Sequence, residues 1–173
     1  MKLRYNQRRL LVLLALLGLA GLQTVRGCSA DPPAETMPAG EAQVERVVDG
    51  DTLLLANRVR VRLIGVNAPE SVKPDSPVEP FGPEASAFTK QFIAGGPARL
   101  EFDKERTDQY GRTLAYVWVG NKMLNEELLR AGLAKWERHY NYSQAMKTRF
   151  RHAEQEARDA RRGIWEYGAQ RGK

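Results

Sequence analysis

The chain has 173 residues, which is enough for one domain with its own hydrophobic core, and its single cysteine excludes an internal disulfide. The formal net charge of +6 does not by itself indicate nucleic-acid binding. Five of the 27 basic residues and none of the 21 acidic residues lie in residues 1–28, so the remaining 22 basic and 21 acidic residues give a net charge of only +1.

Residues 1–28 have the pattern of an export signal. Lysine and arginine residues precede an uninterrupted apolar run from Leu10 to Leu22, which is short for a membrane span and typical of a signal-peptide core. Three outcomes stay open: lipidation of Cys28, because "VRGC" resembles a bacterial lipobox apart from its arginine; cleavage after Ala30; or an uncleaved anchor. Each predicts an exported protein that is secreted, periplasmic or held at the cell envelope through a lipid on Cys28.

The rest of the chain reads as one domain with short flanks. Residues 29–42 are rich in proline, alanine and acidic residues, which predicts a flexible tether. The folded domain is expected from residue 43 to residue 168, followed by a tail at residues 169–173. No internal repeat is present, and we expect a monomer.

Three strand-like runs open the domain, at residues 44–48, 52–55 and 59–64. They are β-branched or alternating, and the turn pairs Asp49-Gly50 and Ala56-Asn57 separate them. The four prolines that follow between residues 71 and 83 predict a loop.

Helices and strands alternate in the second half. Apolar residues on one face predict a helix over residues 84–93, and two further strands are expected at residues 98–102 and 113–119. Residues 121–130 predict a short helix and residues 143–162 a long, charged one. The pattern predicts an α+β fold that is mainly a β barrel: a five-stranded OB-fold with three packed helices.

Oxygen-bearing side chains gather at two predicted turns. Asp49 and Asp51 come from "VDGDT", and Asn67 and Glu70 come from "RLIGVNAPE". Hard divalent cations prefer such carboxylate, amide and carbonyl oxygens. A barrel could bring the two turns together, although solvated acids of a hairpin and a surface glutamate would give the same pattern.

Arginines accompany these oxygens. Arg62 alternates with the apolar residues of its strand, and "RTDQYGRTLAYV" places Arg112 beside Tyr110 at a turn. A guanidinium group offers planar donors that stay charged, which suits a phosphodiester. With a cation, and with Glu70 to activate or orient water, these groups would make a phosphoryl-transfer site.

Five blocks, in the same order, make the sequence closely resemble the staphylococcal-type thermonucleases. They are "VVDGDTLLL", "RLIGVNAPE", "FGPEASAFTK", "EFDKERTDQYGRTLAYV" and "NEELLRAGLAKW", and they cover nearly all of residues 44–165. The resemblance implies an OB barrel with three helices, which agrees with the pattern above. It also implies calcium-dependent hydrolysis of DNA and RNA phosphodiesters that leaves 3′-phosphate ends.

The resemblance also implies roles for single residues. Arg62 and Arg112 would clamp the phosphate and stabilise the transition state, and Glu70 would orient or deprotonate the attacking water. Asp51 and the backbone carbonyl of Ala68, where the family usually has threonine, would bind calcium together with position 67.

Two tyrosines are candidates for substrate binding. Tyr110 matches a tyrosine that helps to bind the substrate phosphate in the family. The family tyrosine that stacks near the base aligns with Arg138, which leaves the nearby Tyr140 as the candidate.

Asn67 departs from the family, which has an aspartate ligand at this position. An amide oxygen can still bind calcium, but one negative charge is lost, which lowers the affinity by about tenfold. We therefore expect a weaker or less selective metal site with catalysis retained. The alternative is an OB-fold module that binds nucleic acid without cutting it and has a degraded calcium site.

Overall fold

The computed structural model describes residues 39–71 and 78–166. The chain divides into two units, residues 1–30 and 31–173, and every described residue belongs to the second. Within the described part, no helix is long and apolar enough to cross a membrane.

Several predictions concern segments outside the described residues. These are the export signal, the lipidation or cleavage sites at Cys28 and Ala30, most of the tether, and the tail at residues 169–173. They stay predictions.

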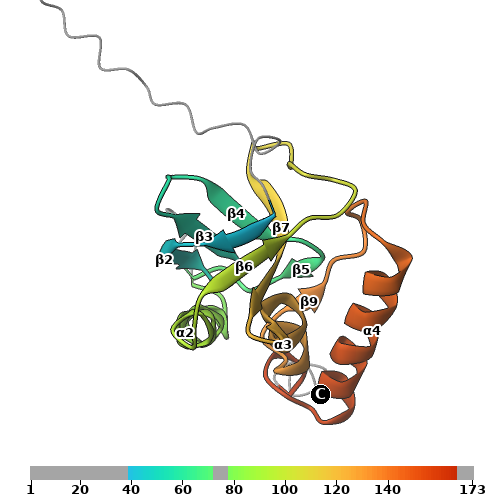
Figure 1. Ribbon diagram of the computed structural model, residues 1–173. Helices are drawn as coiled ribbons and strands as arrows, with labels where there is room; N and C mark the ends of the chain where they lie inside the picture. The colour runs from blue at the N-terminus through green and yellow to red at the C-terminus, as the bar shows by residue number, and fades with distance from the viewer. Residues whose placement is uncertain (1–38, 72–77, 167–173) are drawn as a thin grey trace, which may run out of the picture. The chain divides into compact units, whose positions relative to one another are not determined.

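One sheet, with the spatial order β1-β6-β7-β4-β3-β2, forms the centre of the domain, and β8 pairs with β7 (Figure 1). Its strands are β1 (Gly40–Ala42), β2 (Val44–Asp49), β3 (Thr52–Leu55), β4 (Arg60–Leu63), β6 (Ala98–Glu101), β7 (Thr113–Val119) and β8 (Lys122–Met123). The β4–β7 pair is parallel and the other pairs are antiparallel. Among the described residues no ladder joins β1 to β2, so the barrel is partly open, as OB-folds are.

The five predicted strands correspond to β2, β3, β4, β6 and β7, so the predicted α+β OB-fold is confirmed. The sequence missed four short strands: β1, β8, β5 (Val66–Asn67) and β9 (Lys135–Trp136). The last two form a separate antiparallel pair. Strands of two or three residues leave no period in the sequence, because only pairing with a distant partner defines them.

Strand β1 corrects the predicted tether. Residues 40–42 fall inside the range 29–42, yet they pair antiparallel with residues 98–100 of β6. The tether prediction is therefore wrong for these three residues, since the free edge of β6 gives their backbone groups partners that composition does not reveal.

The three predicted helices are α2 (Gly82–Ile93), α3 (Leu124–Arg130) and α4 (Gln144–Asp159). Helix α3 starts later than expected because residues 122–123 pair with β7, and α4 ends before the predicted Arg162. Helix α3 packs against both β7 and α4, while α2 contacts β2 (Figure 1).

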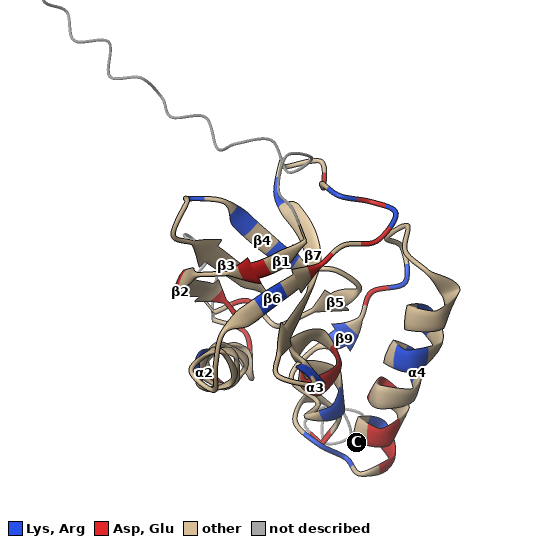
Figure 2. Cartoon of the chain, viewed as in Figure 1, with Lys and Arg blue, Asp and Glu red and all other residues tan. Residues whose placement is uncertain are grey.

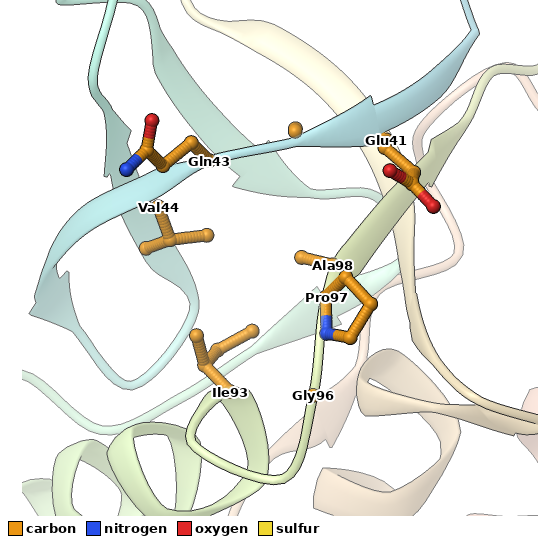
Figure 3. A pocket seen from close by; sticks show the side chains of 8 residues that line it. Glu41, Gln43, Val44, Ile93, Gly96, Pro97 and Ala98 are labelled. Carbon is orange, nitrogen blue, oxygen red and sulfur yellow. The ribbon is translucent and has the colours of Figure 1, made fainter.

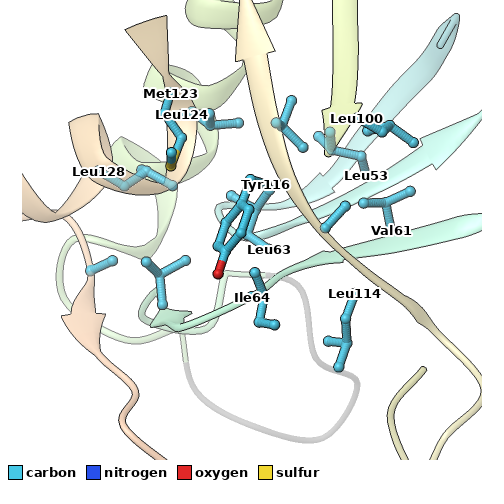
Figure 4. Close-up of a cluster of buried hydrophobic side chains, with 14 of the residues drawn as sticks. Leu53, Val61, Leu63, Ile64, Leu100, Leu114, Tyr116, Met123, Leu124 and Leu128 are labelled. Carbon is cyan, nitrogen blue, oxygen red and sulfur yellow. The ribbon is translucent and has the colours of Figure 1, made fainter. Parts of the chain in front are cut away.

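The core fills the interior between the strands and α3. Tyr116 lies at its centre, surrounded by aliphatic side chains that include Leu63, Leu100 and Leu128 (Figure 4). Fully burying such aliphatic side chains stabilises the fold by about 1.5–3 kcal/mol each. A buried amide, Asn125, adds a polar tie: its Nδ2 donates to the Ile64 carbonyl at 2.9 Å, and its Oδ1 accepts from the Val117 amide at 3.0 Å. Helix α3 is thereby fixed to β7 and to the end of β4, the strand that carries Arg62.

Candidate active site

Arg62 leaves β4 and is buried, with only 5% of its surface exposed. Its Nη1 donates to the carbonyl of Val66 at 2.7 Å, and its Nη2 donates to Asn67 Oδ1 at 3.0 Å. The same Nη2 forms an ion pair with Asp51 Oδ2 at 3.1 Å. Alternation along a strand would also fit a solvated face, and the burial of Arg62 excludes that arrangement.

Asp51 joins the two predicted turns. It lies between β2 and β3 and is buried, yet its Oδ2 accepts a hydrogen bond from the Ala68 amide at 2.7 Å. Burial raises the pKa of the Asp51 carboxyl, while the Arg62 guanidinium and the Ala68 N–H oppose that rise. The expectation that the fold brings the "VDGDT" and "RLIGVNAPE" turns together is confirmed.

The oxygens near Arg62 fit a calcium ion by their chemistry. Asp51 Oδ2 and Asn67 Oδ1 converge on one cationic nitrogen, and the Ala68 carbonyl belongs to the same turn. Within the described residues, no group of three or more His, Cys, Asp or Glu side chains could hold a metal. The candidate donors would be one carboxylate, one amide and one backbone carbonyl, oxygen donors of the kind that a hard cation accepts.

Asp49, the other carboxylate of "VDGDT", accepts hydrogen bonds from neighbouring residues of the fold instead. Its Oδ1 accepts hydrogen bonds from Ser71 Oγ at 2.5 Å, from Ser86 Oγ at 3.2 Å and from the Gly50 amide at 2.8 Å. It thereby ties the turn to helix α2 and to the segment just after Glu70.

Glu70 lies in the segment that follows β5 and is half-buried. Its amide donates to Glu79 Oε2 at 3.2 Å, and its carbonyl accepts from the Glu79 amide at 2.8 Å. Glu79 was not singled out from the sequence, because it lies within the proline-rich loop at residues 71–83, which has no periodic pattern.

Arg112 comes from the turn before β7, and Asp108 sets its position. Asp108 Oδ2 accepts from Arg112 Nε at 2.6 Å, while Oδ1 accepts from the amides of Tyr110 and Arg112, each at 2.9 Å. An aspartate two residues before a Tyr-Gly pair is typical of an Asx turn. The sequence therefore carried a signal for the contact of Asp108 with this turn, although no role was assigned to Asp108. The Tyr110 ring is 74% exposed, with the Arg112 guanidinium 5.4 Å from its centre.

Tyr140 is half-buried and lies within the electrostatic influence of both arginines. It lies between β9 and α4, where burial raises the pKa of its phenol. The positive charges of Arg62 and Arg112 oppose that rise, and the carboxylates of Asp108 and Asp51 reinforce it. Charged groups from the β2–β4 region and from the turn before β7 are therefore near enough to act on the Tyr140 phenol.

A surface recess of about 480 Å³ lies elsewhere (Figure 3). It lies between β1, β2, the end of α2 and the start of β6, with Val44, Ile93, Pro97 and Ala98 among its walls. None of the predicted site residues lines it, so it is not part of the arginine-rich site.

Comparison with known proteins decides the family. The family described as staphylococcal nuclease homologue matches residues 60–167. The chain belongs to the staphylococcal nuclease family. The match spans β4 to the end of α4 and therefore includes Arg62, Glu70 and Arg112.

Individual members of the staphylococcal nuclease family are similar over most of the domain. A thermonuclease of Staphylococcus hyicus is 44% identical over 126 residues, which is 71% of this chain and 74% of the relative. A thermonuclease of Staphylococcus intermedius is 42% identical over 148 residues, or 83% of this chain and 88% of the relative. Endonuclease YncB of Bacillus subtilis (strain 168) is 40% identical over 126 residues, or 70% and 60%.

Proposed function

We propose that this protein, a nuclease of the staphylococcal nuclease family, is an exported calcium-dependent enzyme. It hydrolyses phosphodiester bonds of DNA and RNA with low sequence specificity and leaves 3′-phosphate ends. The observation that carries the proposal is the junction of the two turns, where Asp51 pairs with Arg62 at 3.1 Å and accepts from the Ala68 amide at 2.7 Å, within a chain whose family match includes Arg62, Glu70 and Arg112. Export rests on residues 1–28, with lipidation of Cys28, cleavage after Ala30 or an uncleaved anchor as its possible outcomes.

The arginines would hold the phosphate and the charge that grows on it. A guanidinium group offers planar donors that match the oxygens of a phosphate. Backbone carbonyls fix Arg62, and the Asp108 carboxylate fixes Arg112. Donors held in this way need little reorganisation when negative charge develops on the phosphate oxygens. Tyr110 and Tyr140 would line the same phosphate subsite.

Glu70 would orient the attacking water or take its proton. The water oxygen bonds to phosphorus, the bond from phosphorus to the 5′ oxygen breaks, and the departing oxygen takes up a proton, which leaves a 3′-phosphate. A calcium ion held by Asp51, Asn67 and the Ala68 carbonyl would supply positive charge beside the phosphate.

A second candidate is a module that binds nucleic acid without cutting it. The neutral side chain of Asn67 favours it, because one negative charge fewer would be available to hold calcium. This change would weaken calcium binding, but it does not remove Arg62, Glu70 or Arg112.

Digestion of single-stranded DNA separates the two candidates. The full chain is titrated with calcium from about 1 μM to about 10 mM, a range that reaches the weak affinities of extracellular sites. We expect cutting that requires calcium near the upper end. In Glu70→Gln, the rate should fall by about 10²-fold or more with DNA binding retained, because a general base contributes about 10²–10⁴-fold.

A matched control removes a neighbouring charge. Glu84 is an exposed acid in the first turn of α2, and Glu84→Gln should leave cutting within about twofold of wild type, since surface substitutions away from a site have small effects. Binding of DNA without any cutting in calcium, magnesium or manganese would favour the binding module.

A further inference from the structure

The backbone of Glu70 is held by a reciprocal pair of hydrogen bonds with a single residue, Glu79. The Glu70 N–H donates to the Glu79 carboxylate at 3.2 Å, and the Glu79 N–H donates to the Glu70 carbonyl at 2.8 Å. The N–H and the carbonyl of Glu70 therefore both form hydrogen bonds with Glu79, which lies nine residues later in the chain.

The start of helix α2 closes the same contact. A Cβ added to Gly82 would lie 2.6 Å from the Glu70 carbonyl oxygen and 3.1 Å from that of Pro69. Phe81, just before it, has a left-handed backbone with φ of 71°, which is uncommon for a residue with a bulky side chain. The chain adopts this conformation where α2 begins and where Glu79 meets Glu70.

The neighbours of Glu70 are held on both sides. Ala68 donates its N–H to Asp51, and Ser71 donates its hydroxyl to Asp49. These contacts fix the segment, but they do not touch Glu70 itself. Glu79 supplies two hydrogen bonds to the Glu70 backbone, and its own side chain is exposed.

We propose that Glu79 is a positioning residue for Glu70, and that Gly82 is required at the start of α2 so that Glu79 and Glu70 can meet. The inference rests on the proposed function, in which Glu70 acts on the attacking water. An exposed hydrogen bond contributes little to stability, whereas displacement of a catalytic group by about 1 Å lowers a rate by about 10²-fold. Loss of Glu79 therefore lowers kcat and leaves folding nearly intact.

The test uses the full chain with Glu79→Ala, Glu79→Gln and, as the matched control, Glu84→Ala. We expect Glu79→Ala to lower kcat by about tenfold or more, with KM and the calcium concentration at half-maximal rate within about twofold of wild type. Glu79→Gln keeps a carbonyl acceptor and should recover most of the rate. Glu84→Ala should match wild type. Equal kcat in wild type and Glu79→Ala would overturn the proposal, and so would a loss in Glu79→Ala that Glu79→Gln does not recover.

A second measurement does not depend on cutting. Amide hydrogen exchange of Glu70, followed by NMR, should be faster in Glu79→Ala than in wild type and unchanged in Glu84→Ala. Unchanged exchange in Glu79→Ala would overturn the contact itself. If the wild-type protein cuts no substrate, the proposed function fails, and the Glu70 amide alone then decides whether Glu79 holds this residue.

Gly82→Ala tests the close approach from the other side. The added Cβ must displace the Glu70 carbonyl, so kcat should fall as in Glu79→Ala even though the Glu79 side chain is intact. Combining Gly82→Ala with Glu79→Ala should lower kcat by much less than the product of the two single losses, because both act on the same backbone contact. If kcat of the double variant fell by the product of the two single losses, the two substitutions would not act through the same contact with Glu70.

Discussion

Asn67 lies where the proposed metal ligands and the arginine meet. Its Oδ1 accepts from Arg62 Nη2 at 3.0 Å, and its backbone pairs with that of Lys135. The side chain has the shape of an aspartate but not its charge, and it is exposed. Asn67 therefore gives Arg62 a neutral oxygen acceptor at the position where the family has an aspartate.

Replacement of Asn67 by aspartate should strengthen calcium binding. One added carboxylate beside Asp51 raises the charge of the ligand set, and we expect the dissociation constant for calcium to fall by about tenfold, or about 1.4 kcal/mol. Isothermal titration calorimetry with calcium measures this directly. Asn121→Asp, at the exposed turn before β8, is the matched control and should not change the affinity. Weaker or unchanged binding in Asn67→Asp would mean that position 67 is not a ligand.

At the scale of elements, the end of α3 contacts the segment that follows α4 through backbone atoms. Helix α3 ends in a Schellman motif, in which the Gly132 amide donates to the Leu129 carbonyl and the Leu133 amide donates to the Leu128 carbonyl. Gly132 has φ of 71°, as expected at this position, and its carbonyl accepts from the Ile164 amide at 2.9 Å. A Cβ on Gly132 would lie 2.2 Å from the Arg162 carbonyl oxygen.

Gly132→Ala should destabilise the protein through both strain and contact. A left-handed conformation costs about 1–2 kcal/mol for a residue with a Cβ, and the clash with Arg162 adds to this, so we expect a loss of about 2 kcal/mol or more. Urea unfolding measures the change. Gly120→Ala isolates the strain, because Gly120 has φ of 59° but no atom within 4 Å of the added Cβ. If the two variants lose the same stability, the backbone contact contributes nothing.

The N-terminus of α4 is fixed to the strand β7 by one carboxylate. Asp103 accepts hydrogen bonds from the Tyr116 hydroxyl at 2.8 Å, from the Ser143 amide at 3.0 Å and from the Lys104 amide at 2.8 Å. Burial favours the neutral acid, but these hydrogen bonds outweigh it and lower the pKa of Asp103. The hydrogen bond to Asp103 and burial together raise the pKa of Tyr116.

This lowered pKa gives stability a pH dependence with a definite sign. The Asp103 carboxylate stabilises the fold above its unfolded pKa of about 3.9, and the contribution is lost as the pH falls through the lower folded value. Asp103→Asn should therefore lose about 1–3 kcal/mol at pH 7, and the difference from wild type should shrink below about pH 4. Urea unfolding at a series of pH values measures it, with the exposed Asp159→Asn as the control. A difference that does not depend on pH would contradict this assignment.

At the scale of the whole molecule, charge is spread rather than concentrated. Basic and acidic residues both lie on the strands and along α4 (Figure 2), and many are paired, as Arg130 is with Glu126, Glu127 and Glu156. Such pairs leave little net field to attract a polyanion. Arg62 and Arg112 would then supply most of the direct phosphate contacts.

The salt dependence of binding should therefore be shallow. Two phosphate contacts to a single strand predict a slope of log K against log salt of about −1.4. Fluorescence anisotropy with the non-cutting Glu70→Gln variant at a fixed calcium concentration measures the slope. A slope steeper than about −4 would require a further basic surface beyond these two arginines.

The sequence by itself determined the order of strands and helices, because hydrophobic periodicity, turn pairs and proline are local signals. The runs at residues 44–48, 52–55 and 113–119 and the helix at residues 84–93 are found within a few residues of their predicted limits. Motif blocks in the family order also indicated Arg62, Glu70 and Arg112 as a candidate set.

Only the tertiary structure decided how these residues are held. Arg62 is buried rather than solvated because β4 brings it against Asp51, Val66 and Asn67, and alternation along a strand shows which face a residue takes but not what covers that face. Asp49 accepts a hydrogen bond from Ser86 of α2, and Glu79 accepts one from the Glu70 amide across a loop. Contacts of this kind depend on where the chain returns in space, which no local pattern encodes.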